Sequence, residues 1–167
     1  VLYDKYNKVE VFDSEDGYKK IKDIEIEEMK TPRDMVGSSV TSQLYICDNS
    51  DVIMRVDSKT GVIGEFVETD YEDKNAFTSI SLVENRLLVT SDDSLLMYDI
   101  HSGQVMKKIP YTVDLEEYGV RHAIESNKDS FFVIHKQSDD KPMTVSEINS
   151  EGRVIRVFAN KEQLDCV

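Results

Sequence analysis

The chain has 167 residues, with 20 Lys or Arg against 33 Asp or Glu, and its formal net charge is −13. This length suits one domain, 1–167, with a buried core, and 40% hydrophobic residues argue against wholesale disorder. The negative charge repels phosphate backbones and so disfavours nucleic acid as a partner. No apolar run approaches the roughly 18 residues of a membrane span, so a membrane-spanning protein is excluded.

In chain order, the predicted elements are short strands rich in Val, Ile, Tyr and Phe, separated by turn signals. The first unit holds the predicted strands Val1–Asp4, Val9–Phe12 and Tyr18–Ile26. The second, which Pro32 introduces, holds Asp34–Gly37, Leu44–Cys47, Val52–Val56 and Val62–Val67. The third holds Phe77–Leu82, Arg86–Thr90, Leu95–Asp99 and Gln104–Ile109. The fourth holds Val120–Glu125, Ser130–His135, Met143–Ile148 and Arg153–Phe158.

One turn recurs in every unit, at intervals of about 43 residues. It is closed by Gly17, Gly61, Gly103 and Gly152, each preceded by an Asx residue: Asp13, Asp57, Asp99 and Asn149. Asx side chains accept backbone N–H bonds within a turn, and glycine tolerates a positive φ. Four short strands per repeat of this length are typical of a β-propeller blade. The sequence therefore predicts an all-β propeller of four blades: 1–31 plus 162–167, 32–75, 76–119 and 120–161.

The first unit lacks an innermost strand, which leaves two ways to finish the propeller. The tail Gln163–Val167 resembles the innermost strands. By pairing beside Val1–Asp4 it would close the ring and leave no unpaired edge strand there. Otherwise the chain is a partial propeller with exposed apolar blade faces, which completes a larger ring with another copy as a homo-oligomer.

The repeat resembles that of the NHL family. The resemblance is carried by Pro32–Val36, Leu44–Asp48 and Val52–Asp57, and again by Tyr3-Asp4 with Val9–Asp13. Blades three and four depart from it at Thr90-Ser91-Asp92 and His135-Lys136, and the absence of Trp weakens the WD40 alternative. The resemblance to the NHL family implies a binding platform for protein or RNA, as in tripartite-motif ligases. Some relatives are enzymes with a metal at the propeller axis.

In a propeller, the turns between strands two and three share one face with the entries to the inner strands. Loops on a rigid scaffold converge there, so this face is the expected site for a protein or peptide. The alternative is that its residues are merely polar turn formers. The candidate partner-binding residues are Tyr6, Arg33, Asp34, Asp48, Asn49, Asp92, Asp93, Arg121, His122, His135 and Lys136.

Metal binding and catalysis have little support in the sequence. Asp48, Asn49 and Asp51 are hard oxygen ligands suited to calcium, but their spacing is not that of an EF-hand. Strand pairing should bring His122 close to His135, yet two histidines fall short of a zinc site. No nucleophile elbow, phosphate loop or metalloprotease helix occurs. We therefore expect a non-enzymatic interaction scaffold without cofactor or metal; a metal-dependent propeller enzyme and an RNA-binding NHL domain are the alternatives.

The cysteines and the start of the chain bear on its cellular setting. Cys47 and Cys166 do not form a disulfide framework, which favours a reducing compartment and a cytoplasmic location. They are expected to be buried, with a bridge between them as the alternative. The start, Val1–Asp4, lacks an initiator Met and a signal-peptide pattern, as in an excised or processed segment.

Overall fold

The computed structural model describes residues 2–3, 8–27, 29, 31–48, 52–68, 77–112, 119–127, 129–136 and 143–159. These residues form four antiparallel sheets, three with four strands and the first with three. Helices long and apolar enough to cross a membrane do not occur among them. The predicted all-β architecture with four repeated sheets is confirmed.

Each sheet follows the chain in order, so every strand pairs with its sequence neighbours. The first sheet consists of β1 (Leu2–Tyr3), β2 (Lys8–Asp13) and β3 (Lys19–Glu25). The second has β4 (Pro32–Ser38), β5 (Gln43–Asp48), β6 (Val52–Asp57) and β7 (Ile63–Glu68). The third has β8 (Ser79–Val83), β9 (Arg86–Thr90), β10 (Ser94–Asp99) and β11 (Val105–Pro110). The fourth has β12 (Val120–Asn127), β13 (Ser130–Lys136), β14 (Met143–Asn149) and β15 (Val154–Ala159).

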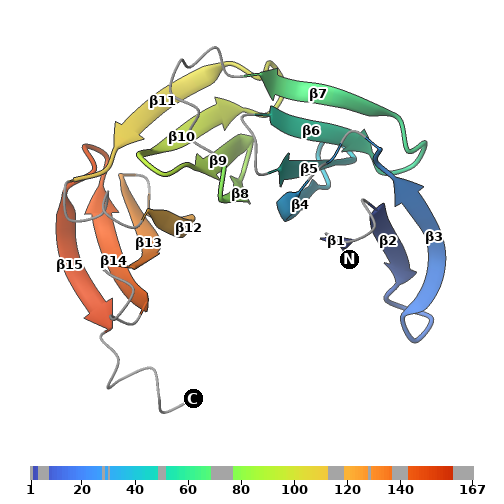
Figure 1. The fold of residues 1–167 in the computed structure, drawn as a ribbon, viewed down its shortest axis with the longest axis horizontal. Coiled ribbons are helices and arrows are strands. Elements are labelled where there is room, and N and C mark those ends of the chain that lie inside the picture. Colours follow the sequence, from blue (N-terminus) through green and yellow to red (C-terminus); the bar gives the residue numbers. More distant parts are fainter. Residues whose placement is uncertain are drawn as a thin grey trace.

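The sheets stand side by side in an open arc (Figure 1). Strands β4, β8 and β12 lie on its inner side, and β3, β7, β11 and β15 form the outer side. The first and fourth sheets are the two ends of the arc, as expected for four propeller blades. The predicted closing strand, Gln163–Val167, lies outside the described residues.

Apolar side chains fill the space between neighbouring sheets, because alternate residues of the middle sheets point to opposite faces. Three core clusters result, one at each junction. They contain Val9, Ile24, Ile46 and Met54 between the first and second sheets, Tyr45, Ile53, Leu87 and Tyr98 between the second and third, and Leu88, Met97, Phe131 and Val133 between the third and fourth.

The recurring turn has the predicted structure. All four turn glycines have φ between 60° and 79°, and each preceding Asx side chain accepts a backbone N–H, as Asp57 does from Thr60 at 2.7 Å. Two of these glycines also approach the preceding sheet closely. A Cβ on Gly152 would overlap the carbonyl oxygen of Pro110, and one on Gly103 would lie 3.0 Å from that of Phe66. The turn therefore joins sheets as well as strands.

The structure refines the starts of predicted strands and describes one of the two cysteines. Phe77 and Thr78 precede β8 rather than belonging to it, and Phe77 is buried in the core beside the second sheet. Tyr18 lies in the turn with φ 59°, so β3 begins one residue later than predicted.

Cys47 is a buried free thiol, as expected, and burial raises its pKa to about 12. Cys166 lies outside the described residues.

Candidate functional site

The beginnings of the inner strands β4, β8 and β12 lie next to one another at one edge of the arc. We call this edge the inner rim and define it by Arg33, Asp34, Thr78, Ser79, Arg121 and His122. The register places the turns between second and third strands at the same edge, since Pro32 pairs with Asp48 and Val120 with His135. The predicted grouping of strand entries and turns on one face is therefore present.

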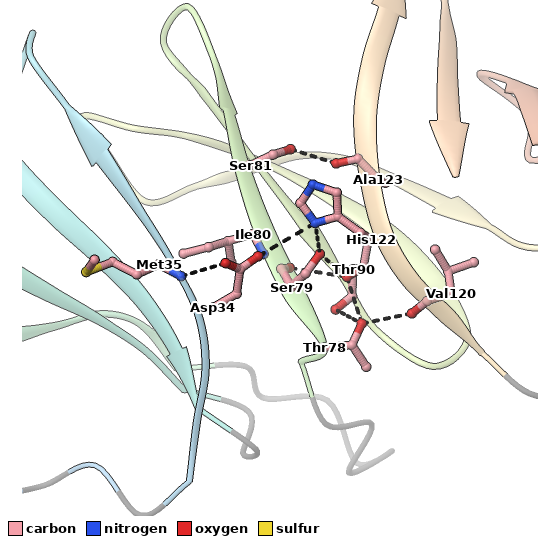
Figure 2. Close-up of polar contacts among 10 residues, drawn as sticks. All are labelled: Asp34, Met35, Thr78, Ser79, Ile80, Ser81, Thr90, Val120, His122 and Ala123. Atoms are coloured by element: carbon pink, nitrogen blue, oxygen red, sulfur yellow. Dashed lines mark hydrogen bonds and ion pairs between the residues drawn. The ribbon is translucent and has the colours of Figure 1, made fainter. Parts of the chain in front are cut away.

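Asp34 connects the second sheet to the third and fourth (Figure 2). Its Oδ1 accepts the backbone N–H of Met35 at 2.8 Å, and its Oδ2 accepts that of Ile80, on β8, at 3.1 Å. The same Oδ2 lies 3.6 Å from Nδ1 of His122 on β12. One carboxylate thus contacts the inner strands of three sheets.

Hydroxyl groups continue this network between the third and fourth sheets (Figure 2). Ser79 Oγ lies 2.7 Å from His122 Nδ1 and 3.0 Å from Thr90 Oγ1. Thr78 Oγ1 donates to the carbonyl oxygen of Val120 at 2.9 Å, and Ser81 Oγ donates to that of Ala123 at 2.8 Å. These bonds hold β8 and β12 in a fixed relation, which fixes the geometry of the rim.

The electrostatics of the network favour a charged Asp34. Burial raises the pKa of this carboxyl group, but the nearby His122 ring and the hydrogen bonds from the amides of Ile80 and Met35 outweigh it. The net result is a pKa below the ordinary value, so Asp34 is an anion that already has its partners. Its two oxygens accept hydrogen bonds from the protein's own backbone.

Asp34, His122 and Ser79 are the residue types of a catalytic triad, but their arrangement differs from one. In a triad the serine and the carboxylate contact different nitrogens of the imidazole. Here both Ser79 Oγ and Asp34 Oδ2 face the same atom, Nδ1 of His122. The serine and the carboxylate are therefore not placed at the two opposite nitrogens of the imidazole, as a triad requires.

Two arginines flank the network, and a shallow pocket lies beside the first. Arg33 on β4 and Arg121 on β12 are both exposed. An open pocket of about 370 Å³ is lined by Leu2, Pro32, Arg33, Asp34 and Met35, at the junction of the first and second sheets. The rim therefore offers hydrogen-bond donors and a concave surface next to a rigid centre.

Other predicted site residues are buried or engaged within the protein. Asp48 is buried and accepts the backbone N–H of Thr31 at 2.7 Å. His135 is also buried, and its Nε2 lies 2.9 Å from Ser146 Oγ within the fourth sheet. The expectation that these two side chains face a partner is wrong, because each completes the strand ends of its own sheet.

The remaining candidate partner-binding residues differ in their exposure and contacts. Asp92 is exposed, whereas Asp93 accepts hydrogen bonds from Ser91 and Ser94 and lies 3.5 Å from Lys108 Nζ. Lys136 is half-buried at the end of β13. Tyr6 and Asn49 lie outside the described residues.

The two histidines of the fourth sheet each have a hydrogen-bond partner of their own. A register shift separates Val120, the partner of His135, from His122, and the two rings bind different residues: His122 contacts Ser79 and His135 contacts Ser146. Within the described ranges, no three His, Cys, Asp or Glu side chains are grouped as metal ligands. Asn49 and Asp51, two of the three candidate calcium ligands, are outside those ranges.

Sequence reasoning missed the hydroxyl residues of the rim and a second pocket at the opposite edge. Thr78 and Ser79 directly precede Ile80, whose place in the register matches that of Asp34 and His122, so they too lie at the entry of an inner strand. The second pocket, of about 620 Å³, lies between the turns Val83–Arg86 and Glu125–Asn127. Its lining includes an ion pair, with Arg86 2.8 Å from Glu125.

Comparison with solved structures shows the fold. The chain is similar to Sqt1 of Saccharomyces cerevisiae, a WD40 β-propeller, with a TM-score of 0.57 and 16% identity. The match covers 93% of this chain and 39% of the Sqt1 chain, so the chain spans less than half the length of that protein. No protein-family model matches the sequence, and no curated protein matches it. The β-propeller fold is thus established, whereas the NHL repeat stays a prediction.

Proposed function

We propose that this propeller is a non-enzymatic interaction scaffold that binds a protein or peptide along the inner rim. The observation that carries the proposal is the network joining Asp34, Ser79 and His122, which links three sheets through their inner strands. A surface fixed in this way loses little conformational freedom when a partner binds. Side chains that flank it are accordingly suited to recognition.

The chemistry of the rim indicates what the partner presents. Both oxygens of Asp34 accept backbone N–H groups, whereas Arg33 and Arg121 are exposed on either side of β8. A guanidinium group donates to carboxylates in a planar, two-pronged geometry. We propose a segment with acidic side chains that contact these arginines.

Two further properties belong to this proposal. The binding mode is of the NHL type, with the ligand on the face where strand entries meet the turns. The setting is cytoplasmic, which agrees with the buried free thiol of Cys47. Catalysis is not part of the role, in keeping with the shared contact atom of His122.

The test compares partner binding by the intact chain and by a rim variant. Partners cross-linked to the wild-type chain are identified, purified and titrated against Arg33→Ala/Arg121→Ala. Loss of two charge-assisted contacts should weaken binding by at least about tenfold. The control is Arg153→Ala, which removes an arginine that is 75% exposed just before β15 and away from the rim. Unchanged affinity in the rim variant, for every recovered partner, contradicts the proposal.

A further inference from the structure

The outward face of the fourth sheet is apolar and is not covered by any described residue. Phe131, Val133 and Ile148 point toward the third sheet and belong to its core cluster. Residues that alternate with them point outward, away from the arc. We call this surface the terminal face; its apolar members are Ile124, Phe132, Ile134, Met143, Val145 and Phe158.

The register and ring contacts show that these side chains form one continuous surface. Ile124 pairs with Phe132, and Ile134 pairs with Val145, so neighbours on adjacent strands share the face. The ring of Phe132 meets that of Phe158 edge-on, with centroids 5.2 Å apart. Every other junction in the arc covers such a face with the next sheet.

The polar groups on the terminal face can be covered without leaving a charge unpaired. Glu147 accepts hydrogen bonds from Ser130 at 2.7 Å and from Arg156 at 2.8 Å. The guanidinium carbon of Arg156 also lies 4.5 Å from the centre of the Phe158 ring. A buried carboxylate with these partners keeps its compensation when a second surface excludes water.

The opposite end of the arc is charged instead. On the outward face of the first sheet, Lys20 Nζ lies 2.8 Å from Glu10 and 2.7 Å from Asp23, and Lys8 Nζ lies 2.7 Å from Glu10. Both networks are paired internally, but covering the first sheet would desolvate four charges, against the two of Glu147 and Arg156 on the terminal face, so it is more costly. The charge distribution therefore argues against joining one copy's fourth sheet to another copy's first sheet.

From this asymmetry we infer that the terminal face binds the terminal face of a second copy in a two-fold symmetric dimer. Two sheet faces pack about 10 Å apart, like the halves of a β-sandwich. The symmetric contact covers both apolar ends and leaves both charged ends in water. It also leaves the two inner rims available, so it is independent of the proposed partner binding.

The test measures the mass of the 167-residue chain by sedimentation over a dilution series. Wild type should have twice the chain mass at high concentration and dissociate on dilution. Ile124→Lys, at a side chain that is 45% exposed, should weaken self-association by at least about tenfold, because the charge would be buried. Met106→Lys is the control, since Met106 is 57% exposed on β11, outside the terminal face.

A charge reversal at the other end separates the symmetric dimer from a ring. Lys20→Glu should leave the dimer intact, whereas a ring joined head to tail would lose it. Circular dichroism checks that each variant is folded, and Met143→Lys replaces Ile124→Lys if the latter is not. A wild-type monomer at all concentrations, a dimer unaffected in the folded terminal-face variant, or loss of the dimer in Lys20→Glu overturns the inference.

Discussion

At the scale of single residues, Asp34 has the most connections in the candidate site. Its partners on β8 and β12 come from other sheets, so the contact depends on how sheets stack. The sequence could place Asp34 at the entry of an inner strand because turn and strand patterns are local. It could not reveal the cross-sheet bonds, since nothing local specifies the angle between blades.

Asp34→Ala tests this contribution to stability. The change leaves the amide of Ile80 without its acceptor, and we expect the free energy of unfolding to fall by about 1–2 kcal/mol. Urea denaturation provides the measurement. Asp129→Ala is the control, because Asp129 is exposed in the β12–β13 turn. Equal unfolding free energies for the two variants would contradict the role given to Asp34.

His135 shows where residue type alone misleads. A histidine at a strand end resembles a surface ligand in the sequence, but its position opposite Val120 places it against the third sheet. Burial lowers the pKa of His135, and Nδ1 has no hydrogen-bond partner in the described part of the chain. The folded protein therefore favours the neutral imidazole.

A pH dependence of stability follows from His135. Its pKa is lower in the folded state than in the unfolded chain, so the unfolded state binds the proton more readily. The neutral imidazole of His135 therefore contributes its full share of folding stability above the pKa of a histidine in the unfolded chain, about 6.5. This contribution is lost as the pH falls below that value. Urea midpoints between pH 8 and 5 should fall for wild type and less steeply for His135→Gln. Parallel curves would refute this assignment.

At the scale of elements, strands and turns were well predicted because their signals are local. Alternating apolar residues mark the strands, and the Asx–glycine turn recurs with its expected hydrogen bonds. The second role of the turn glycines was not visible in the sequence. Gly152 meets the backbone of Pro110 on the preceding sheet, whereas a Cβ on Gly17 would meet nothing within 4 Å.

This difference predicts unequal costs for the same substitution. Gly17→Ala should cost only the backbone strain of a positive φ, about 1–2 kcal/mol. Gly152→Ala adds a backbone overlap at the junction of the third and fourth sheets, so its loss of unfolding free energy should be clearly larger. Chemical denaturation of both variants is the measurement. Similar losses would show that the close approach to Pro110 does not constrain the sheets.

At the scale of the whole molecule, the arc combines a rigid inner rim with two unlike ends. The repeat predicted four sheets because turn chemistry and strand length fix each unit. Which rim side chains would be free could not be predicted, since that depends on the hydrogen bonds between β4, β8 and β12. The charged and apolar ends likewise became apparent only when the register assigned each residue to a face.

The central claim is that partners bind where the inner strands begin. Hydrogen–deuterium exchange of the full chain, with and without a recovered partner, measures this directly. The account predicts slower exchange on binding at residues 31–36, 78–81 and 120–123, with little change at the opposite edge. Protection confined to the turns around Glu84 and Asn127 would place the partner at the other edge and contradict the account.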